Sequence, residues 1–422
     1  MKKWSLKGAM ANLADVLILS AFVLFISKSL YNVPMGIMAI IGFYYCLRSP
    51  ALLWRHPVIR IYTVMFLCLW LPLLLSLPDA VNSARSAQTV SGYLRFLFIG
   101  IYVICSLQRP GALSRLHLGI FCITAFWCID AVIQYLFQMD LFGYPYEPGH
   151  ITGMFYPKNT IAHVTAAVSP LYFESIRAYS RRYRWLWLLL VPLFLVILLS
   201  GRRAAWIMLA VSISGYVYYL LKQTAFNRRL LMKLGLWGAV LIGAMGIVIA
   251  TNKPLQSRIH VTMGLFSGNY EATDKATARR LPLWQTAITI FKDNWINGIG
   301  PRGFRYVYQQ YSSADDFWHK DGSTHPHQLL LEVLAETGAI GFAGLLLFAL
   351  VFYRFVKKGR LGMPLCPWWL SVLTVTFPIN SLMAFYGSYW SSMIWWLLAL
   401  TFAAAATHLQ GQNEALSSCR QR

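Results

Sequence analysis

Residues 329–353 read LLLEVLAETGAIGFAGLLLFALVFY, a run in which Glu332 and Glu336 are the only charged residues. At about 1.5 Å per residue, a helix of this length can cross a hydrocarbon core of roughly 30 Å. Similar runs recur along the 422-residue chain, which is 57% hydrophobic and only 12% charged. That composition leaves too little polar surface for a soluble globule, so the sequence predicts an all-α polytopic membrane protein.

The charges between the apolar runs predict the topology. Alternate short connections are rich in Arg and Lys, as at 177–184, and the positive-inside rule places them in the cytoplasm. The N-terminal apolar stretch has no small-residue cleavage site, so we interpret it as a retained first span. About twelve transmembrane helices are predicted, with both termini inside, near 10–30, 32–47, 59–77, 91–107, 116–136, 158–176, 185–200, 204–221, 233–251, 329–353, 367–385 and 389–407.

This topology predicts four regions. Residues 1–250 hold transmembrane helices 1 to 9, 251–328 form a large exported loop, 329–407 hold helices 10 to 12, and 408–422 form a cytoplasmic tail. Topology and contacts with anionic membrane lipids account for the net charge of +22, so no nucleic-acid partner is predicted. The seven cysteines lie outside the exported loop, which argues against a disulfide framework or a zinc site.

The exported segments contain two structured stretches. In RRLPLWQTAITIFKDN, residues 279–294, apolar side chains such as Leu283, Ala287 and Ile290 recur at helical spacing. This spacing predicts an amphipathic helix lying along the membrane surface, and NGIGPRGF beyond it predicts a turn. The second stretch, 137–157, is rich in Gly, Pro and aromatic residues, and Asn159 is predicted to cap the helix that follows it.

Two pairs of arginines lie on the exported side. Arg202 and Arg203 occupy a tight turn between spans, where arginine is normally rare. They could be snorkelling side chains, but a guanidinium fork also matches the oxygens of a phosphate-bearing ligand. Arg279 and Arg280 open the predicted surface helix, where they could bind either anionic headgroups or a substrate.

His325 and His327 immediately precede the apolar helix of 329–353. The positive end of the helix dipole favours a neutral imidazole, which can act as a general base. A metal-binding pair and a solvated loop are the alternatives, although the nearby Asp315, Asp316 and Asp321 form no ligand spacing. We therefore predict no metal ion and no cofactor. Within the helix, three glycines at three-residue spacing should allow close approach of another helix: Gly338, Gly341 and Gly344.

Four segments over roughly residues 150–345 carry a wider resemblance. His327-Gln328 is followed by nine residues and then by Gly338-x-x-Gly341. Before it come ITGMFYPKNTIA at 151–162, Arg203-Ala-Ala-Trp, and Arg280-x-x-x-Trp with GIGPRGF beyond it. In this order they resemble the motifs of the O-antigen ligase and O-antigen polymerase membrane superfamily, whose most specific pattern is His-(Asn/Ser/Gln)-x9-Gly-x-x-Gly.

The resemblance implies a GT-C-like fold in the bacterial inner membrane, with a periplasmic active site and a large periplasmic loop between helices 9 and 10. It implies transfer of a glycan from an undecaprenyl-diphosphate-linked O-antigen donor to the lipid A-core acceptor. His327 would be the base, and Arg203 and Arg280 would clamp the diphosphate. The remaining candidates for substrate binding are Arg202, Arg279, His325, Gln328 and Asn159.

Three other functions stay open. An O-antigen polymerase or a protein O-oligosaccharyltransferase would share the superfamily, but the close match to the His-x9-Gly pattern and the short segment after the last span favour a ligase. A lipid-linked sugar flippase would belong to a different class and would place charges deep within its spans. The span interiors are nearly free of charge, with Asp15, Arg95 and Asp130 as the main exceptions, so an enzyme is favoured.

Overall fold

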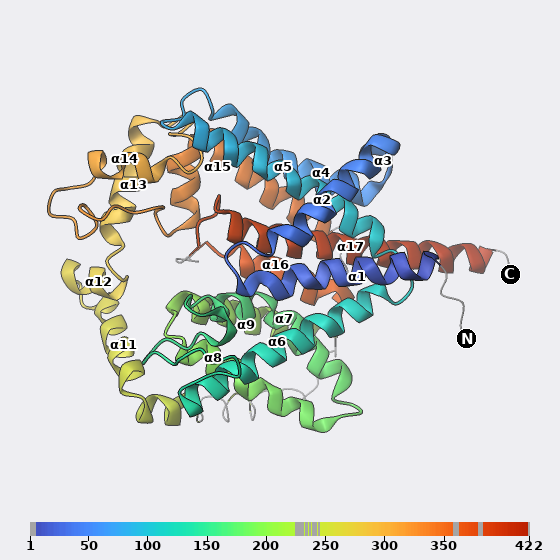
Figure 1. Ribbon diagram of the computed structural model, residues 1–422, viewed down its shortest axis with the longest axis horizontal. Helices are drawn as coiled ribbons and strands as arrows, with labels where there is room; N and C mark the ends of the chain where they lie inside the picture. Colours follow the sequence, from blue (N-terminus) through green and yellow to red (C-terminus); the bar gives the residue numbers. More distant parts are fainter. Residues whose placement is uncertain are drawn as a thin grey trace. The chain divides into compact units, whose positions relative to one another are not determined.

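The computed structural model describes residues 6–223, 232, 235, 238, 243, 245–357, 363–378 and 383–420. Every regular secondary-structure element in this part of the chain is a helix (Figure 1). The predicted all-α class is therefore confirmed. The chain divides into two compact units. The first unit comprises residues 1–123, 171–175 and 282–422, and the second comprises residues 124–170 and 176–281.

The first unit is built around α5, which packs against α2, α4 and α17, while α15 packs against α4. The helices α4, α5 and α15 lie side by side (Figure 1). Its helices are α1 (Leu6–Val23), α2 (Asn32–Arg48), α3 (Leu52–Arg55), α4 (Pro57–Leu75), α5 (Ser83–Ser106), most of α13 (Leu281–Asp293), α14 (Phe304–Tyr311), α15 (Leu329–Lys357), α16 (Cys366–Val375) and α17 (Ser388–Arg420).

The second unit contains α8 (Leu190–Leu199), α9 (Arg203–Gln223), α11 (Lys253–Met263) and α12 (Tyr270–Ala276), and α6 (Ala112–Phe137) and α7 (Ile161–Tyr179) contribute to both units. Helix α8 packs against α9, and α11 packs against α12. The Ser169 hydroxyl of α7 donates a hydrogen bond of 2.6 Å to Ser212 of α9. These contacts fix the turn between α8 and α9 within a packed group of helices.

Among the described residues, six helices are long and apolar enough to cross a membrane, and each coincides with a predicted span: Pro57–Leu75, Ser83–Ser106, Ala112–Phe137, Arg203–Gln223, Leu329–Lys357 and Ser388–Gln412. Shorter apolar helices at Leu13–Ile26, Arg184–Leu199 and Met363–Val375 coincide with three more predicted spans. About half of the predicted span 233–251 lies outside the described residues. A helical membrane protein is confirmed, while twelve spans and a GT-C-like fold stay predictions.

The predicted span 367–385 is wrong in its extent. Helix α16 ends at Val375, and the described residues 376–378 and 383–387 are not helical. Proline disfavours the helical conformation of the residue before it, so Phe377-Pro378 cannot continue the helix. The Pro378 carbonyl instead accepts a hydrogen bond from Leu329 N at 3.3 Å, which ties this loop to the start of α15.

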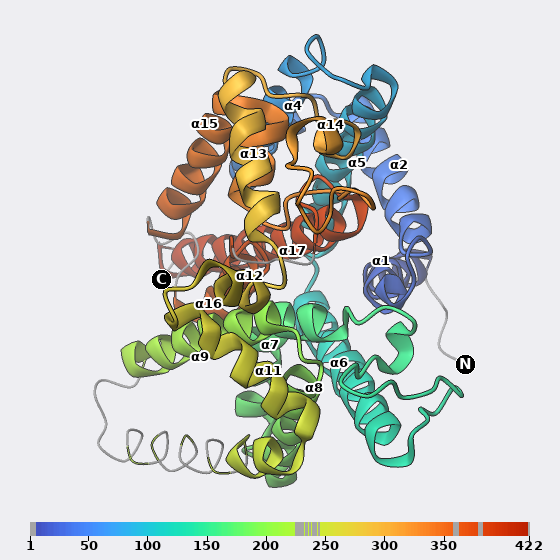
Figure 2. The same cartoon turned by 90° about the vertical axis from the view of Figure 1, so that its left-hand side faces the viewer.

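The region predicted to be exported, residues 251–328, contains four α-helices, α11 to α14, where one was predicted. Helix α13 confirms the predicted amphipathic helix, but its apolar face does not lie on lipid. Leu283, Ala287 and Ile290 are buried in a cluster with apolar residues of α14 and α15, including Phe304, Tyr308 and Ala335. Figure 2 shows α13 alongside α15. Helical periodicity predicts an apolar face, and here neighbouring helices cover it.

Two glutamates of α15, Glu332 and Glu336, hold the loops around this helix. Glu336 accepts hydrogen bonds from the backbone N–H of Arg302 at 2.7 Å and of Phe304 at 3.4 Å. Glu332 accepts from the N–H of Phe385 at 2.8 Å and of Tyr386 at 3.0 Å. Both carboxylates are fully buried. Because a buried charge is costly without such donors, these bonds fix the 300–304 turn and the start of α17 against α15.

The glycines of α15 confirm the predicted close packing. A Cβ atom at Gly344 would lie 2.2 Å from the Cys68 carbonyl oxygen of α4. A Cβ atom at Gly338 would lie 2.2 Å from the Ile296 carbonyl oxygen, and Gly338 itself has φ +63°, which interrupts α15. Backbone therefore approaches backbone at two places along this helix, and only glycine fits both.

We predict that Gly344→Ala lowers the free energy of unfolding by about 1–3 kcal/mol, because the added methyl group forces α4 and α15 apart. Gly36→Ala on α2 is the matched control, since a Cβ atom there meets nothing within 4 Å. Thermal unfolding of the detergent-solubilised proteins measures both effects. Equal unfolding midpoints for the two variants would contradict the close contact between α4 and α15.

Candidate functional site

Four arginines of the second unit act on one another electrostatically: Arg202, Arg203, Arg258 and Arg280. Arg202 and Arg203 lie in the turn between α8 and α9, Arg258 lies on α11, and Arg280 directly precedes α13. We call these four residues the arginine cluster. Three separate segments of the chain therefore bring guanidinium groups to one place.

Backbone geometry explains how the cluster assembles. Gly201 has φ +62°, which permits the sharp turn before Arg202, and a Cβ atom at Gly201 would lie 2.5 Å from the Arg258 guanidinium. Arg258 uses this space to donate hydrogen bonds to the carbonyl oxygens of Gly201 at 2.8 Å and Gly149 at 3.2 Å. Arg203 donates to the carbonyl oxygen of Ala276 at the end of α12. These bonds link the turn, α11 and α12.

The arginine cluster carries a concentrated positive charge. Burial and the neighbouring Arg203 and Arg202 lower the pKa of Arg280 to about 10. Burial and Arg258 likewise lower the pKa of Arg202. Within the described residues, no carboxylate lies within ion-pair distance of any member of the cluster. Such a group of half-buried guanidiniums favours an anion, and diphosphate oxygens match their geometry well.

His150 and Asn159 lie beside the cluster. His150 Nε2 lies 3.5 Å from Arg258 Nη2, and His150 Nδ1 lies 3.3 Å from Asn159 Nδ2. Burial, followed by the charges of Arg258 and Arg202, lowers the pKa of His150 below its ordinary value. His150 is therefore a neutral imidazole at neutral pH.

The predicted capping role of Asn159 is wrong. Thr160 is the N-cap residue of α7, and no side chain caps this helix. Asn159 Nδ2 instead donates a hydrogen bond of 2.9 Å to the Ser200 carbonyl oxygen, directly before the arginine turn. The helix begins one residue later than the sequence pattern suggested, and this shift turns the Asn159 side chain toward the cluster's backbone.

The histidine pair lies in the first unit, at the start of α15. The His325 and His327 rings have centroids 3.9 Å apart. His325 is buried, and its Nδ1 lies 2.8 Å from the Thr324 hydroxyl, whereas His327 is half-buried. The backbone of His327 has φ +55°, an uncommon conformation for a residue with a side chain. Strained backbone of this kind concentrates at functional sites.

Gln328 and Arg279, which the sequence predicts to bind substrate, lie outside the arginine cluster. The Gln328 side chain accepts a hydrogen bond of 2.6 Å from Leu331 N and so caps α15 directly after His327. Arg279 is exposed and has φ +57°, while its neighbour Arg280 is half-buried among the other arginines. The cluster thus contains both members of the first arginine pair, Arg202 and Arg203, and Arg280 of the second pair.

The sequence reasoning missed Arg258 and His150. Arg258 stands in an exported segment, where the positive-inside rule makes arginine unusual, and that signal could have singled it out. His150 carries no comparable signal, because its role depends on the contacts with Arg258 and Asn159. Among the described residues, no group of three His, Cys, Asp or Glu residues could hold a metal ion.

The fold and the arginine cluster define a helical membrane protein with a concentrated group of positive charges. Residues 188–349 match the family model described as Wzy_C, O-antigen ligase. This match confirms the resemblance recognised from the sequence motifs, over this segment of the chain. A comparison with curated proteins finds no match. The matched segment includes Arg203, Arg258, Arg280 and His327, while His150 and Asn159 lie before it.

We predict that Arg258→Gln raises the pKa of His150, because it removes a positive charge that opposes protonation of the imidazole. The measurement is a pH titration of the histidine ring signals by NMR, with the His150 signal assigned from its loss in His150→Gln. Arg181→Gln, at an exposed position of the same unit, is the control and should leave the titration unchanged. An unchanged or lower pKa in Arg258→Gln would show that the two side chains are not coupled.

Proposed function

We propose that this protein is an O-antigen ligase that transfers a glycan from undecaprenyl diphosphate to the lipid A-core oligosaccharide on the periplasmic face of the inner membrane. The arginine cluster is the observation that carries this proposal. The match to the O-antigen ligase family model supports a ligase acting on a lipid-linked glycan, and the cluster supplies the chemistry that such a donor requires.

The donor's leaving group is a diphosphate, which gains negative charge as the bond to the sugar breaks. Fixed guanidinium groups stabilise this charge more in the transition state than in the ground state, and so accelerate the reaction. Arg203 and Arg280 are the proposed clamp. Their pre-organised positions support this role, because Arg203 is held by the Ala276 carbonyl oxygen and Arg280 lies in the field of two other arginines.

The acceptor's sugar hydroxyl is a weak nucleophile until a base takes its proton. We assign that base to His327, which is the more exposed of the two histidines and has the strained backbone. The hydroxyl oxygen bonds to the anomeric carbon, the bond from that carbon to the diphosphate oxygen breaks, and undecaprenyl diphosphate leaves with the electron pair. The hydroxyl proton passes to His327. A single displacement of this kind inverts the anomeric carbon.

The charged residues within the spans support an enzyme over a flippase. Asp15 pairs with Arg109 at 3.1 Å and Arg115 at 2.8 Å. Asp130 accepts hydrogen bonds from Leu141 N and Met154 N, which hold the 137–157 segment against α6. Arg95 donates to the Asn32 side chain at 2.8 Å and the Ser388 hydroxyl at 2.7 Å. Each of these charges has a structural partner, as expected where it serves the fold.

We predict that Arg203→Gln and Arg280→Gln each lower kcat for glycan transfer by about 10²–10³-fold, the usual loss for one transition-state donor. His327→Ala should lower kcat by about 10²–10⁴-fold, the usual contribution of a general base. The measurement uses purified protein, a synthetic undecaprenyl-diphosphate-linked glycan and a lipid A-core acceptor.

Two exposed residues of the second unit provide controls, Arg181→Gln and His260→Ala, and both should transfer at the wild-type rate. If His327→Ala retains the wild-type kcat while correctly folded, His327 is not the base. If Arg203→Gln and Arg280→Gln change only KM, the cluster binds the donor without stabilising the transition state.

A further inference from the structure

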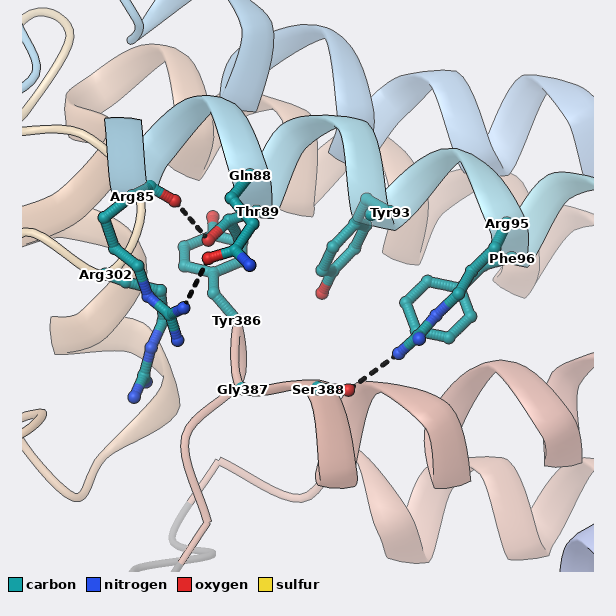
Figure 3. A pocket seen from close by; sticks show the side chains of 11 residues that line it. Arg85, Gln88, Thr89, Tyr93, Arg95, Phe96, Arg302, Tyr386, Gly387 and Ser388 are labelled. Carbon is teal, nitrogen blue, oxygen red and sulfur yellow. Dashed lines mark hydrogen bonds between the residues drawn. The ribbon is translucent and has the colours of Figure 1, made fainter. Parts of the chain in front are cut away.

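A pocket of about 290 Å³ lies in the first unit, and its lining includes no member of the arginine cluster or of the histidine pair. One wall is a face of α5, whose residues Arg85, Thr89 and Tyr93 recur at helical spacing. Arg302 and the Tyr386–Ser388 segment before α17 complete the lining (Figure 3). The same glutamates that anchor the 300–304 turn and the start of α17 therefore also shape this pocket.

Positive charge is concentrated in the pocket. Figure 3 shows Arg85 and Arg302 together at one end and Arg95 beside Phe96 at the other. Within the described residues, Arg85 and Arg95 pair with no carboxylate; Arg85 donates to Gln88 Oε1 at 2.7 Å, and Arg95 bonds to neutral side chains. Arg302 lies 3.9 Å from Glu332, which anchors it from the α15 side. The lining thus presents more positive than negative charge.

A buried polar atom adds to this picture. Arg302 is almost fully buried, and within the described residues its Nε finds no hydrogen-bond partner. Close by, burial and the charges of Arg302 and Arg85 lower the pKa of Arg305. Grouped guanidiniums with unused donors favour an anion with several oxygens, of which phosphate is the best match.

The uncharged part of the lining suits a sugar ring. Tyr93, Phe96 and Tyr386 supply aromatic surface, and Gln88, Thr89 and Ser388 supply polar groups. The tyrosines are held rigidly, since the Tyr93 hydroxyl lies 2.9 Å from Ser391 Oγ and the Tyr386 hydroxyl lies 2.9 Å from Thr337 Oγ1. The volume is at the lower end of the roughly 300–1,000 Å³ typical of ligand pockets, so it suits a monosaccharide and not a long glycan.

We propose that this pocket binds a phosphate group carried on a saccharide, with Arg85 and Arg302 on the phosphate and the aromatic wall against the sugar ring. The inference goes beyond the proposed transfer reaction and does not depend on it, because the pocket and the arginine cluster share no residue. Another source of the same phosphate chemistry is the headgroup of a membrane lipid, and the test separates the two.

The experiment is saturation-transfer NMR on the full-length protein in detergent, with glucose 6-phosphate, glucose and glycerol 3-phosphate as probes. An Arg203→Gln, Arg280→Gln background removes the contribution of the arginine cluster. We expect glucose 6-phosphate to bind about tenfold more tightly than either other probe, the effect of one hydrogen bond to a charged group. Equal binding of glucose would overturn the phosphate site, and equal binding of glycerol 3-phosphate would overturn the saccharide in favour of a headgroup.

Two variants place the binding in this pocket. Arg85→Gln removes a charge, and Gly92→Leu fills the pocket from α5, where a Cβ atom meets nothing within 4 Å. Each should weaken glucose 6-phosphate about tenfold or more, while Arg85→Lys should retain part of the affinity and Gly36→Leu on α2 all of it. Unchanged affinity in both Arg85→Gln and Gly92→Leu, with normal unfolding midpoints, would overturn the proposal.

Discussion

The structure of the first unit depends on two buried carboxylates, one helical turn apart on α15. Glu332 and Glu336 face the interior, where a polar group without hydrogen-bond partners would be strongly unfavourable. Four backbone N–H groups from two loops satisfy them, and Arg302 adds a positive charge at 3.9 Å. The hydrogen bonds to Glu332 and Glu336 therefore fix both loops. These loops carry Arg302 and the Tyr386–Ser388 segment, which form part of the pocket lining.

The second unit uses the opposite charge. Within the arginine cluster, Arg258 is held by the carbonyl oxygens of Gly201 and Gly149, and Arg203 is held by that of Ala276. Carbonyl groups orient a guanidinium without cancelling its charge, so the cluster retains its attraction for an anion. Burial and the charges of Arg258 and Arg202 lower the pKa of His150, so the ring adds little positive charge of its own. This arrangement suits the proposed diphosphate-binding site.

The sequence predicted what depends on local pattern. Apolar length predicted the helices, and motif spacing predicted that Arg203, Arg280 and His327 matter. It could not predict which partner covers an apolar face, as α13 shows by packing against α14 and α15. Arg258 did carry a signal, as an arginine in a segment predicted to be exported, but the sequence could not predict its bond to the Gly201 carbonyl oxygen, more than fifty residues away in the chain. Glu332 and Glu336 were visible as charges within an apolar run, but their four N–H donors come from distant loops.

The most direct test of the account is lipopolysaccharide banding in cells that lack their native O-antigen ligase and express this protein. Membrane levels of wild type and Arg203→Ala should be matched by immunoblot before the comparison. The account predicts that wild type restores the long-chain ladder and that Arg203→Ala leaves only core bands. A full ladder from Arg203→Ala, or a wild-type ladder that forms only when the host polymerase is also missing, would contradict it.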